Sequence, residues 1–166
     1  MKITSKLPEV TSSIFSVMGQ MAHKHQAINL SQGFPGFDTD PALHALVTEA
    51  MASGHNQYAP MQGVYSLREQ IASKLNTLYG SAYHPENEVT VTVGATQALY
   101  TAISAFVQVD DEVIVLKPAY DSYEPAILMH GGKVVPIQLK APDYKVDWNA
   151  VQEAITPATK MLIINT

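Results

Sequence analysis

Short apolar runs alternate with segments of helical period in the second half of the chain, and this order constrains the fold more than any other feature. The runs with strand character cover residues 88–93, 111–116, 133–139 and 160–165. The helical segments between them cover residues 94–107, 122–132 and 147–155. Strands that alternate with helices pair in parallel through right-handed crossovers. We therefore predict an α/β fold with a mostly parallel sheet, covered on both faces.

Two residue patterns refine this expectation. Pro136 lies inside the third strand run, and because proline cannot donate a hydrogen bond to a neighbouring strand, that run is predicted to lie at a sheet edge. In the helix that follows Val93, the spacing predicts one buried face. Its expected members are Leu99, Ala102, Ile103, Phe106 and Val107.

The first half of the chain has helical periodicity interrupted by two turn-rich loops. Helices are predicted over residues 11–25 and 41–52, and a third from about Val64 to Leu78. The loops read SQGFPGF (31–37) and HNQYAPMQG (55–63), and glycine and proline break regular structure in both. Both loops are candidate sites.

Composition excludes several classes of function. The formal charge is −5 and the Lys and Arg residues are scattered, so no basic surface for nucleic acid or an anionic membrane is expected. Cysteine is absent, which removes disulfides and thiolate chemistry. Neither a signal peptide nor an apolar run of spanning length is present in these residues. A cytoplasmic protein is the expectation.

Val93-Gly94-Ala95-Thr96 lies between a predicted strand and a predicted helix. Small side chains let backbone N–H groups approach an anion, and a helix N-terminus carries partial positive charge. The segment is thus a candidate phosphate site. Turns of small residues also serve tight packing alone, and this one matches neither the dinucleotide pattern nor the phosphate loop of nucleotide-binding proteins.

Other polar clusters are interpreted as structural. His23 and His25 point in different directions on a helix, which argues against a shared metal ion, and no metal site is expected. Ser73-Lys74 falls within an amphipathic helix, near its solvent face. The acidic run from Asp110 to Glu112 is most simply a solvated turn.

Taken together, SQGFPGF, NQYAP (56–60), VGAT (93–96) and KPAYDSY (117–123) resemble the class I/II aminotransferases, in the branch of methionine and kynurenine aminotransferases. The resemblance runs from about Lys6 to Thr166. It implies the fold-type I architecture of transferases dependent on pyridoxal 5'-phosphate (PLP), with three α/β/α layers. Residues 1–40 would form the N-terminal arm and substrate loop, and residues 41–166 the start of the large cofactor-binding domain.

The same resemblance assigns roles to residues of the cofactor site. Gly94, Ala95 and Thr96 would bind the cofactor phosphate, and Tyr120 would stack on the pyridine ring. Tyr58 matches the residue that reaches the phosphate in the partner subunit, which implies a homodimer. Without the resemblance, Tyr120 would be interpreted as a half-buried tyrosine at a helix start.

The substrate loop receives roles in the same way. Gly33 matches the glycine beside the substrate carboxylate, and Phe34 would line the substrate pocket. Their alternatives are a turn glycine and a core aromatic residue. Gly36 stands where relatives often carry aspartate, so contacts of that acidic residue are not carried over.

The implied activity is transfer of an amino group from a methionine, aromatic or kynurenine-like amino acid to a 2-oxo acid. The final Ile-Asn-Thr resembles the opening of the family's Asn-Thr-Pro-His-Asn-Pro segment, so we expect a truncated chain that lacks the Schiff-base lysine and is inactive alone. One alternative is a non-catalytic phosphate- or nucleotide-binding α/β module. Against it, the strand 111–116 ends at Lys117-Pro118 rather than at an acidic ribose ligand.

Overall fold

The structure is a computed structural model that describes residues 3–33 and 35–165. In this part of the chain, the helices and strands are α1 (Ile14–Lys24), α2 (Pro41–Ala52), α3 (Tyr65–Tyr79), α4 (Gly94–Phe106), β1 (Glu112–Lys117), α5 (Tyr123–Met129), β2 (Lys133–Gln138), α6 (Trp148–Glu153) and β3 (Thr159–Ile163). They belong to two compact units. The sheet unit contains the residues up to Val17 and those from Val93 onward, and the helical unit contains Met18–Thr92.

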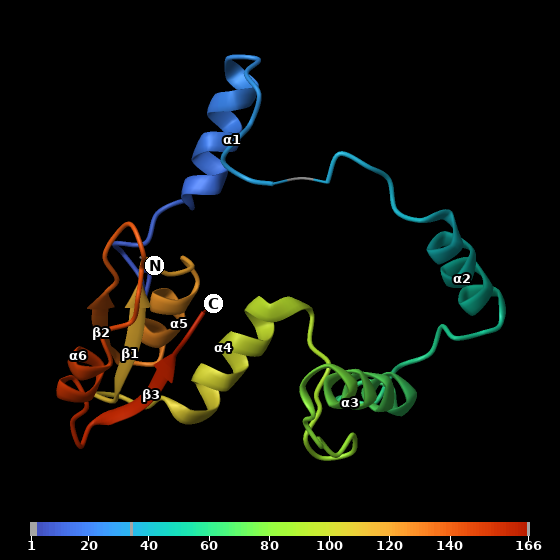
Figure 1. Cartoon of the computed structure of the whole chain (residues 1–166). Coiled ribbons are helices and arrows are strands. Elements are labelled where there is room, and N and C mark those ends of the chain that lie inside the picture. Colours follow the sequence, from blue (N-terminus) through green and yellow to red (C-terminus); the bar gives the residue numbers. More distant parts are fainter. Residues whose placement is uncertain (1–2, 34, 166) are drawn as a thin grey trace. The chain divides into compact units, whose positions relative to one another are not determined.

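Three parallel strands form the centre of the sheet unit, in the order β2-β1-β3 (Figure 1). β1 pairs with both neighbours, so Val113 lies between Val134 on one side and Met161 on the other. The predicted parallel sheet is confirmed. Each crossover between consecutive strands contains one helix, α5 and then α6.

Side chains of β1 alternate between two apolar clusters, one on each face of the sheet. Val113 and Val115 are fully buried against Ile103 of α4 and Ile127 of α5. Ile114 and Leu116 contact the other cluster, which contains Val151 of α6. Burial of one such side chain stabilises a fold by about 1.5–3 kcal/mol. The predicted α/β/α layering therefore exists in this unit.

Pro136 lies at the edge of the described sheet, as predicted. It pairs in register with Val115, and β2 has β1 as its one strand neighbour among the described residues. The missing amide hydrogen of proline therefore removes no bond from a central strand.

The predicted strand at 88–93 is wrong. These residues form no strand in the structure, and the described sheet has three strands where the sequence predicts four. Val91 donates its N–H to the carbonyl of Gln62 at 2.9 Å, and Val93 donates to the side chain of Gln97 at 2.6 Å. The acceptors of these two N–H groups belong to a loop and to a helix rather than to a neighbouring strand. Residues typical of strands are therefore present here without strand pairing.

The predicted buried face of α4 is correct only in part. Ile103 and Val107 are buried, and Leu99 packs against the same cluster. Phe106 is 62% exposed and Ala102 is also exposed, because α5 and the sheet contact a narrower stripe than the sequence period predicts.

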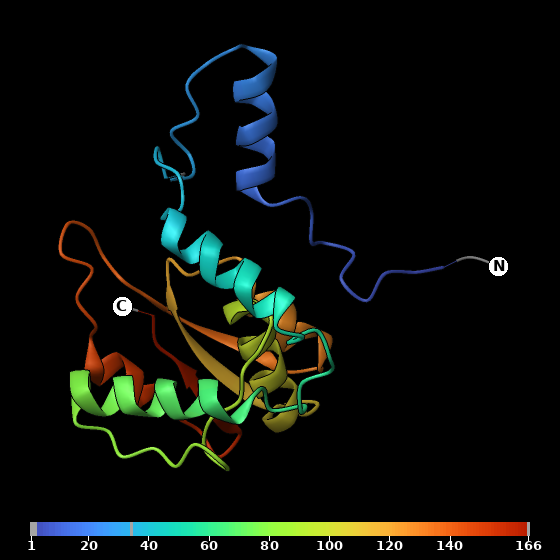
Figure 2. The ribbon, with the colours of Figure 1, turned by 90° about the vertical axis from the view of Figure 1, so that its right-hand side faces the viewer.

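In the helical unit, the segment after α3 runs back along that helix (Figures 1 and 2). Arg68 of α3 fixes this return by donating to the carbonyls of Pro85 and Glu86 at 2.7 and 2.9 Å. α2 has the predicted bounds, and Asp40 caps it by accepting a hydrogen bond from Ala42 N–H at 2.8 Å. The helical prediction for this region is confirmed.

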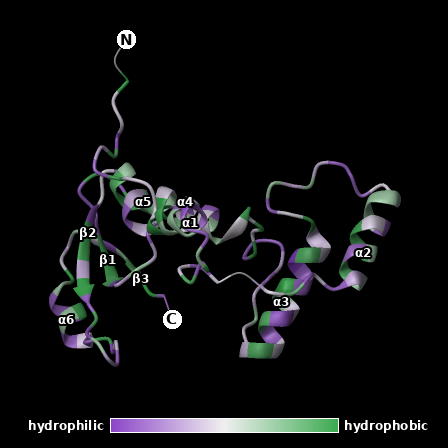
Figure 3. Ribbon diagram, turned by 90° about the horizontal axis from the view of Figure 1, so that it is seen from above, coloured by the Kyte–Doolittle hydropathy of each residue, from purple (hydrophilic) through white to green (hydrophobic). Residues whose placement is uncertain are grey.

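Figure 3 shows strands coloured mostly hydrophobic and a two-coloured α3, as expected for a sheet core and an amphipathic helix. The large apolar residues of α2 are at least half exposed in the described part of the chain: Leu43, Leu46, Val47 and Met51. No described helix is long and apolar enough to cross a membrane.

Candidate functional site

The predicted phosphate turn forms the first turn of α4, although no strand of the described chain precedes it. Gly94 opens the helix with φ of +79°, a backbone conformation that side chains disfavour, and Ala95 and Thr96 follow it. A Cβ atom built at Gly94 would meet no described heavy atom within 4 Å. The first N–H groups of a helix lack intrahelical acceptors. The dipole of this thirteen-residue helix makes the end that begins at Gly94 electropositive, which favours an anionic ligand.

Gln97 holds this turn in place and was not identified from the sequence. Its side-chain oxygen accepts a hydrogen bond from Val93 N–H at 2.6 Å. The bond resembles the return bond of a capping box, but the N-cap is Val93 and Gln97 lies four residues after it, so the usual sequence signal is absent. Its effect is to fix the backbone direction on which Gly94 depends.

Thr96 lines a small pocket between α4 and α5, with a volume of about 160 Å³. Ser122 lies on the opposite wall, and its Oγ is buried without a hydrogen-bond partner in the part of the chain that the structure describes. The remaining wall residues are Leu99, Tyr100, Pro125, Ala126 and Met129. The pocket brings the predicted phosphate turn close to the loop that carries Tyr120.

Tyr120 lies in the loop between β1 and α5, at the carboxyl end of β1. Its ring contacts the ring of Tyr123 edge-on, with centroids 6.0 Å apart and an interplanar angle of 64°. Tyr123 is buried and donates its N–H to the carbonyl of Tyr120 at 3.3 Å. Tyr120 remains 46% exposed, so it is fixed on one side and accessible on another. Ligands of parallel α/β sheets bind at this end of the strands.

The other predicted site residues belong to the helical unit. Tyr58 is fully exposed, and a Cβ at Gly33 would meet no described atom within 4 Å. Phe34 lies outside the described residues. The approach of Tyr58 and Gly33 to the α4 turn therefore stays a prediction.

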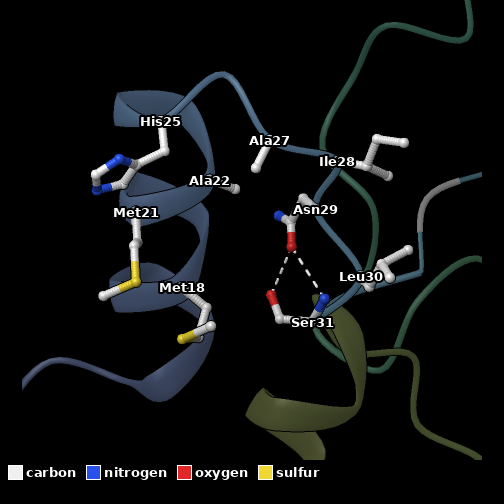
Figure 4. Close-up of a pocket in the computed structure, with 9 residues that line it drawn as sticks. All are labelled: Met18, Met21, Ala22, His25, Ala27, Ile28, Asn29, Leu30 and Ser31. Carbon is white, nitrogen blue, oxygen red and sulfur yellow. Dashed lines mark hydrogen bonds between the residues drawn. The ribbon is translucent and has the colours of Figure 1, made fainter.

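A pocket of about 520 Å³ lies between α1 and the segment that leads to Gly33 (Figure 4). Met18 and Met21 of α1 contribute to one wall, and the other is formed by residues 27–31, where Ala27 and Asn29 point toward α1. Ser31 donates from Oγ and from its N–H to Asn29 Oδ1, at 2.6 and 3.0 Å. These bonds shape the start of the predicted substrate loop.

Most charged groups beside Tyr120 are acidic, because Glu9, Asp121 and Glu124 line one pocket with it. Lys117 forms an ion pair with Glu124 across the Tyr120 loop. At the opposite end of the sheet, the hydrogen bond and charge of Asp110 raise the pKa of Lys133, and Glu112 adds to the effect. The described residues contain no group of three or more His, Asp or Glu placed to hold a metal ion.

Comparison with known proteins agrees with this geometry. A family model described as "Aminotransferase class I and II" matches residues 25–166. Methionine aminotransferase of Escherichia coli (strain K12) is 48% identical over 162 residues, which cover 98% of this chain and 42% of that protein. Kynurenine–oxoglutarate transaminase 1 of Rattus norvegicus is 34% identical, with 97% of this chain and 41% of that protein covered.

Solved structures give the same result. A crystal structure from Escherichia coli, described as having a methionine aminotransferase function, superposes with a TM-score of 0.92 at 46% identity, covering 98% of this chain and 42% of that one. N-succinyldiaminopimelate aminotransferase from Mycobacterium tuberculosis gives a TM-score of 0.91 at 39% identity, covering 99% and 44%. The chain spans about two fifths of the length of these relatives. Its architecture is that of fold-type I aminotransferases, and the chain belongs to the class I and II aminotransferase family.

Proposed function

We propose that the whole protein transfers an amino group from an amino acid to a 2-oxo acid with pyridoxal 5'-phosphate as its cofactor. The observation that carries the proposal is the glycine-initiated first turn of α4, whose Thr96 lines a pocket together with Ser122 of the Tyr120 loop. The names of the relatives support a methionine, aromatic or kynurenine-like donor. The expected location is the cytoplasm.

Gly94, Ala95 and Thr96 would hold the cofactor phosphate. Their backbone N–H groups lie in the first turn of α4, where the helix dipole favours an anion. The hydroxyl of Thr96 adds a possible donor at the same turn. Gly94 also carries no side chain that would keep a phosphate group from the backbone.

Tyr120 would lie against the cofactor ring. Aromatic faces stack on flat conjugated rings, and the edge-on contact with buried Tyr123 limits the rotation of the Tyr120 ring. When bound, the cofactor supplies a conjugated ring that accepts the electron pair released from the substrate. The role of this chain is to bind and orient that ring.

Tyr58 would contact the phosphate of a second copy, which makes the proposed active unit a homodimer. Its complete exposure supports a role outside its own unit. Gly33 and Phe34 would contact the substrate. No lysine of this chain matches the family's covalent lysine, so we assign binding to these residues and expect the chain alone to be inactive.

The test uses the protein extended to the length of its relatives. Methionine, phenylalanine, kynurenine and aspartate are supplied in turn with a 2-oxo acid, and amino-group transfer is followed. We expect activity on at least one of the first three. Activity on aspartate alone would refute the donor class, and cofactor binding without any transfer would favour a non-catalytic phosphate-binding module. The 166-residue chain is assayed in parallel, and turnover above the rate of free cofactor would contradict its assigned binding-only role.

A further inference from the structure

An ion pair spans the loop that carries Tyr120. Lys117 is the last residue of β1 and Glu124 is the second residue of α5, and Lys117 Nζ contacts Glu124 Oε1. The two side chains are 32% and 38% exposed, so the pair is only partly screened by solvent. Six residues separate its members, and Tyr120 is the third of them.

Both ends of this loop are anchored in the sheet unit. The carbonyl of Lys117 accepts a hydrogen bond from Leu139 N–H at 2.7 Å, which ties it to the end of β2. On the other side, α5 is fixed by Ile127, which is fully buried. The intervening loop has fewer buried side chains, and Tyr120 itself is half exposed. A side-chain link across the loop therefore adds a restraint to a segment that packing restrains only in part.

The pair also sets the charge next to Tyr120. Glu124 and Tyr120 line one pocket of about 400 Å³, together with Glu9 and Asp121. Glu124 without its partner would add a further net negative charge to that pocket and weaken binding of an anionic ligand. Lys117 without its partner would be free to contact such a ligand directly. In the pair the two charges compensate each other.

We propose that Lys117 and Glu124 are positioning residues: their ion pair holds the loop of Tyr120 in its ring-binding position and compensates the charge of Glu124 beside it. The inference rests on the proposed cofactor function. If the inference is correct, exchanging the two charges should preserve the function of the pair, because positions 117 and 124 would still carry opposite charges.

The experiment is a charge-reversal cycle in the full-length holoenzyme. Lys117→Glu and Glu124→Lys each place like charges across the loop, and the double variant restores an opposite pair. We expect Lys117→Glu, which loosens the loop and adds negative charge, to weaken cofactor binding by about two- to fivefold, the effect of a partly exposed pair. Glu124→Lys should weaken it less, because its added positive charge attracts the anionic cofactor and opposes the effect of the loosened loop. Both single variants should shift the absorption band of the bound cofactor. The double variant should recover to within about twofold. Thermal melting of all three should stay close to that of the parent.

Lys133→Glu is the matched control, because Lys133 forms a similar pair with Asp110 at the other end of the same sheet. It should leave cofactor affinity and absorption unchanged. Single variants that bind the cofactor like the parent would overturn the inference. A double variant that binds the cofactor as weakly as the single variants would also overturn it. The same holds if the loss of cofactor affinity in each variant simply follows its loss of melting temperature.

A second readout separates this inference from the proposed function. Amide hydrogen exchange of residues 119–122 in the cofactor-free protein should become faster in each single variant and return toward the parent rate in the double variant. If the parent protein shows no transamination, the proposed function fails. The exchange result still decides whether the pair restrains the loop, and equal rates in all variants would overturn the inference.

Discussion

The guanidinium of Arg68 donates from Nε to the carbonyl oxygen of Gly63 at 3.1 Å. The same side chain reaches two carbonyls of the 84–91 segment and lies 5.4 Å from the centroid of the Tyr65 ring. Arg68 is 6% exposed, and among the described residues it is the one charged residue that is buried. One side chain thus connects the end of the Tyr58 loop, α3 and the segment that leads to the α4 turn.

Replacing Arg68 should destabilise the helical unit strongly. Arg68→Met leaves three carbonyl oxygens without their donor, and we expect the free energy of unfolding to fall by about 2–4 kcal/mol. Arg68→Lys keeps the charge but lacks the planar fork, so it should recover only part of the loss. Urea denaturation measures both. Lys74→Met, on the exposed side of the same helix, is the control and should change little.

Gly63 should tolerate no side chain. It has φ of +95°, and a Cβ atom there would lie 2.7 Å from Cβ and Cγ2 of Val91. Gly54 has φ of +84° but open space around a Cβ. Gly54→Ala should therefore cost about 1–2 kcal/mol through backbone strain alone, and Gly63→Ala clearly more. If thermal or urea unfolding shows equal losses of stability for the two variants, then Val91 moves aside from the new Cβ atom at no energetic cost.

Gln97 should influence phosphate binding without contacting substrate. Gln97→Ala removes the 2.6 Å bond to Val93 N–H and loosens the turn that begins at Gly94. Gln97→Glu can still accept that bond but adds a negative charge beside the phosphate site. We expect cofactor affinity to fall about threefold for alanine and further for glutamate. Fluorescence titration checks the order, and Gln152→Glu on α6 serves as the control.

Tyr58 should affect the cofactor but not the fold. Its side chain is fully exposed, so Tyr58→Phe removes only a hydroxyl from the surface. We expect unchanged melting and cofactor affinity reduced by about three- to tenfold in the dimer, as for loss of a hydrogen bond to a charged group. Tyr79→Phe, a substitution of another exposed tyrosine, should leave affinity unchanged. Loss of affinity that persists in a monomer would refute the cross-subunit contact.

The Lys133–Asp110 pair should give stability a dependence on alkaline pH. The 2.7 Å ion pair raises the pKa of Lys133 in the folded state. A raised folded-state pKa means that the stabilisation is complete below the ordinary lysine pKa and is lost as pH rises through the folded value. Above about pH 10.4, the stability of the parent should therefore fall more steeply with pH than that of Asp110→Asn. If stability falls with pH equally steeply in both proteins, the raised pKa of Lys133 is contradicted.

Much of the sheet unit was predictable from local pattern. The continuous apolar runs of β1 and β3, and the helical period between them, identified a parallel α/β unit because buried strands and crossover helices have distinct periods. Pro136 indicated the edge because a missing donor is a local property. Residues 88–93 were misassigned because strand composition does not say whether a partner strand lies alongside.

The sequence by itself determined the family, the α/β order and the small-residue turn at Gly94, since these depend on residue type and spacing along the chain. Only the tertiary structure decided that Gln97 holds that turn, that Thr96 and Ser122 share a pocket, and that Lys117 pairs with Glu124 across the loop of Tyr120. These contacts depend on how helices and strands pack in space. Side-chain direction and distance arise from that packing, and no local periodicity specifies them.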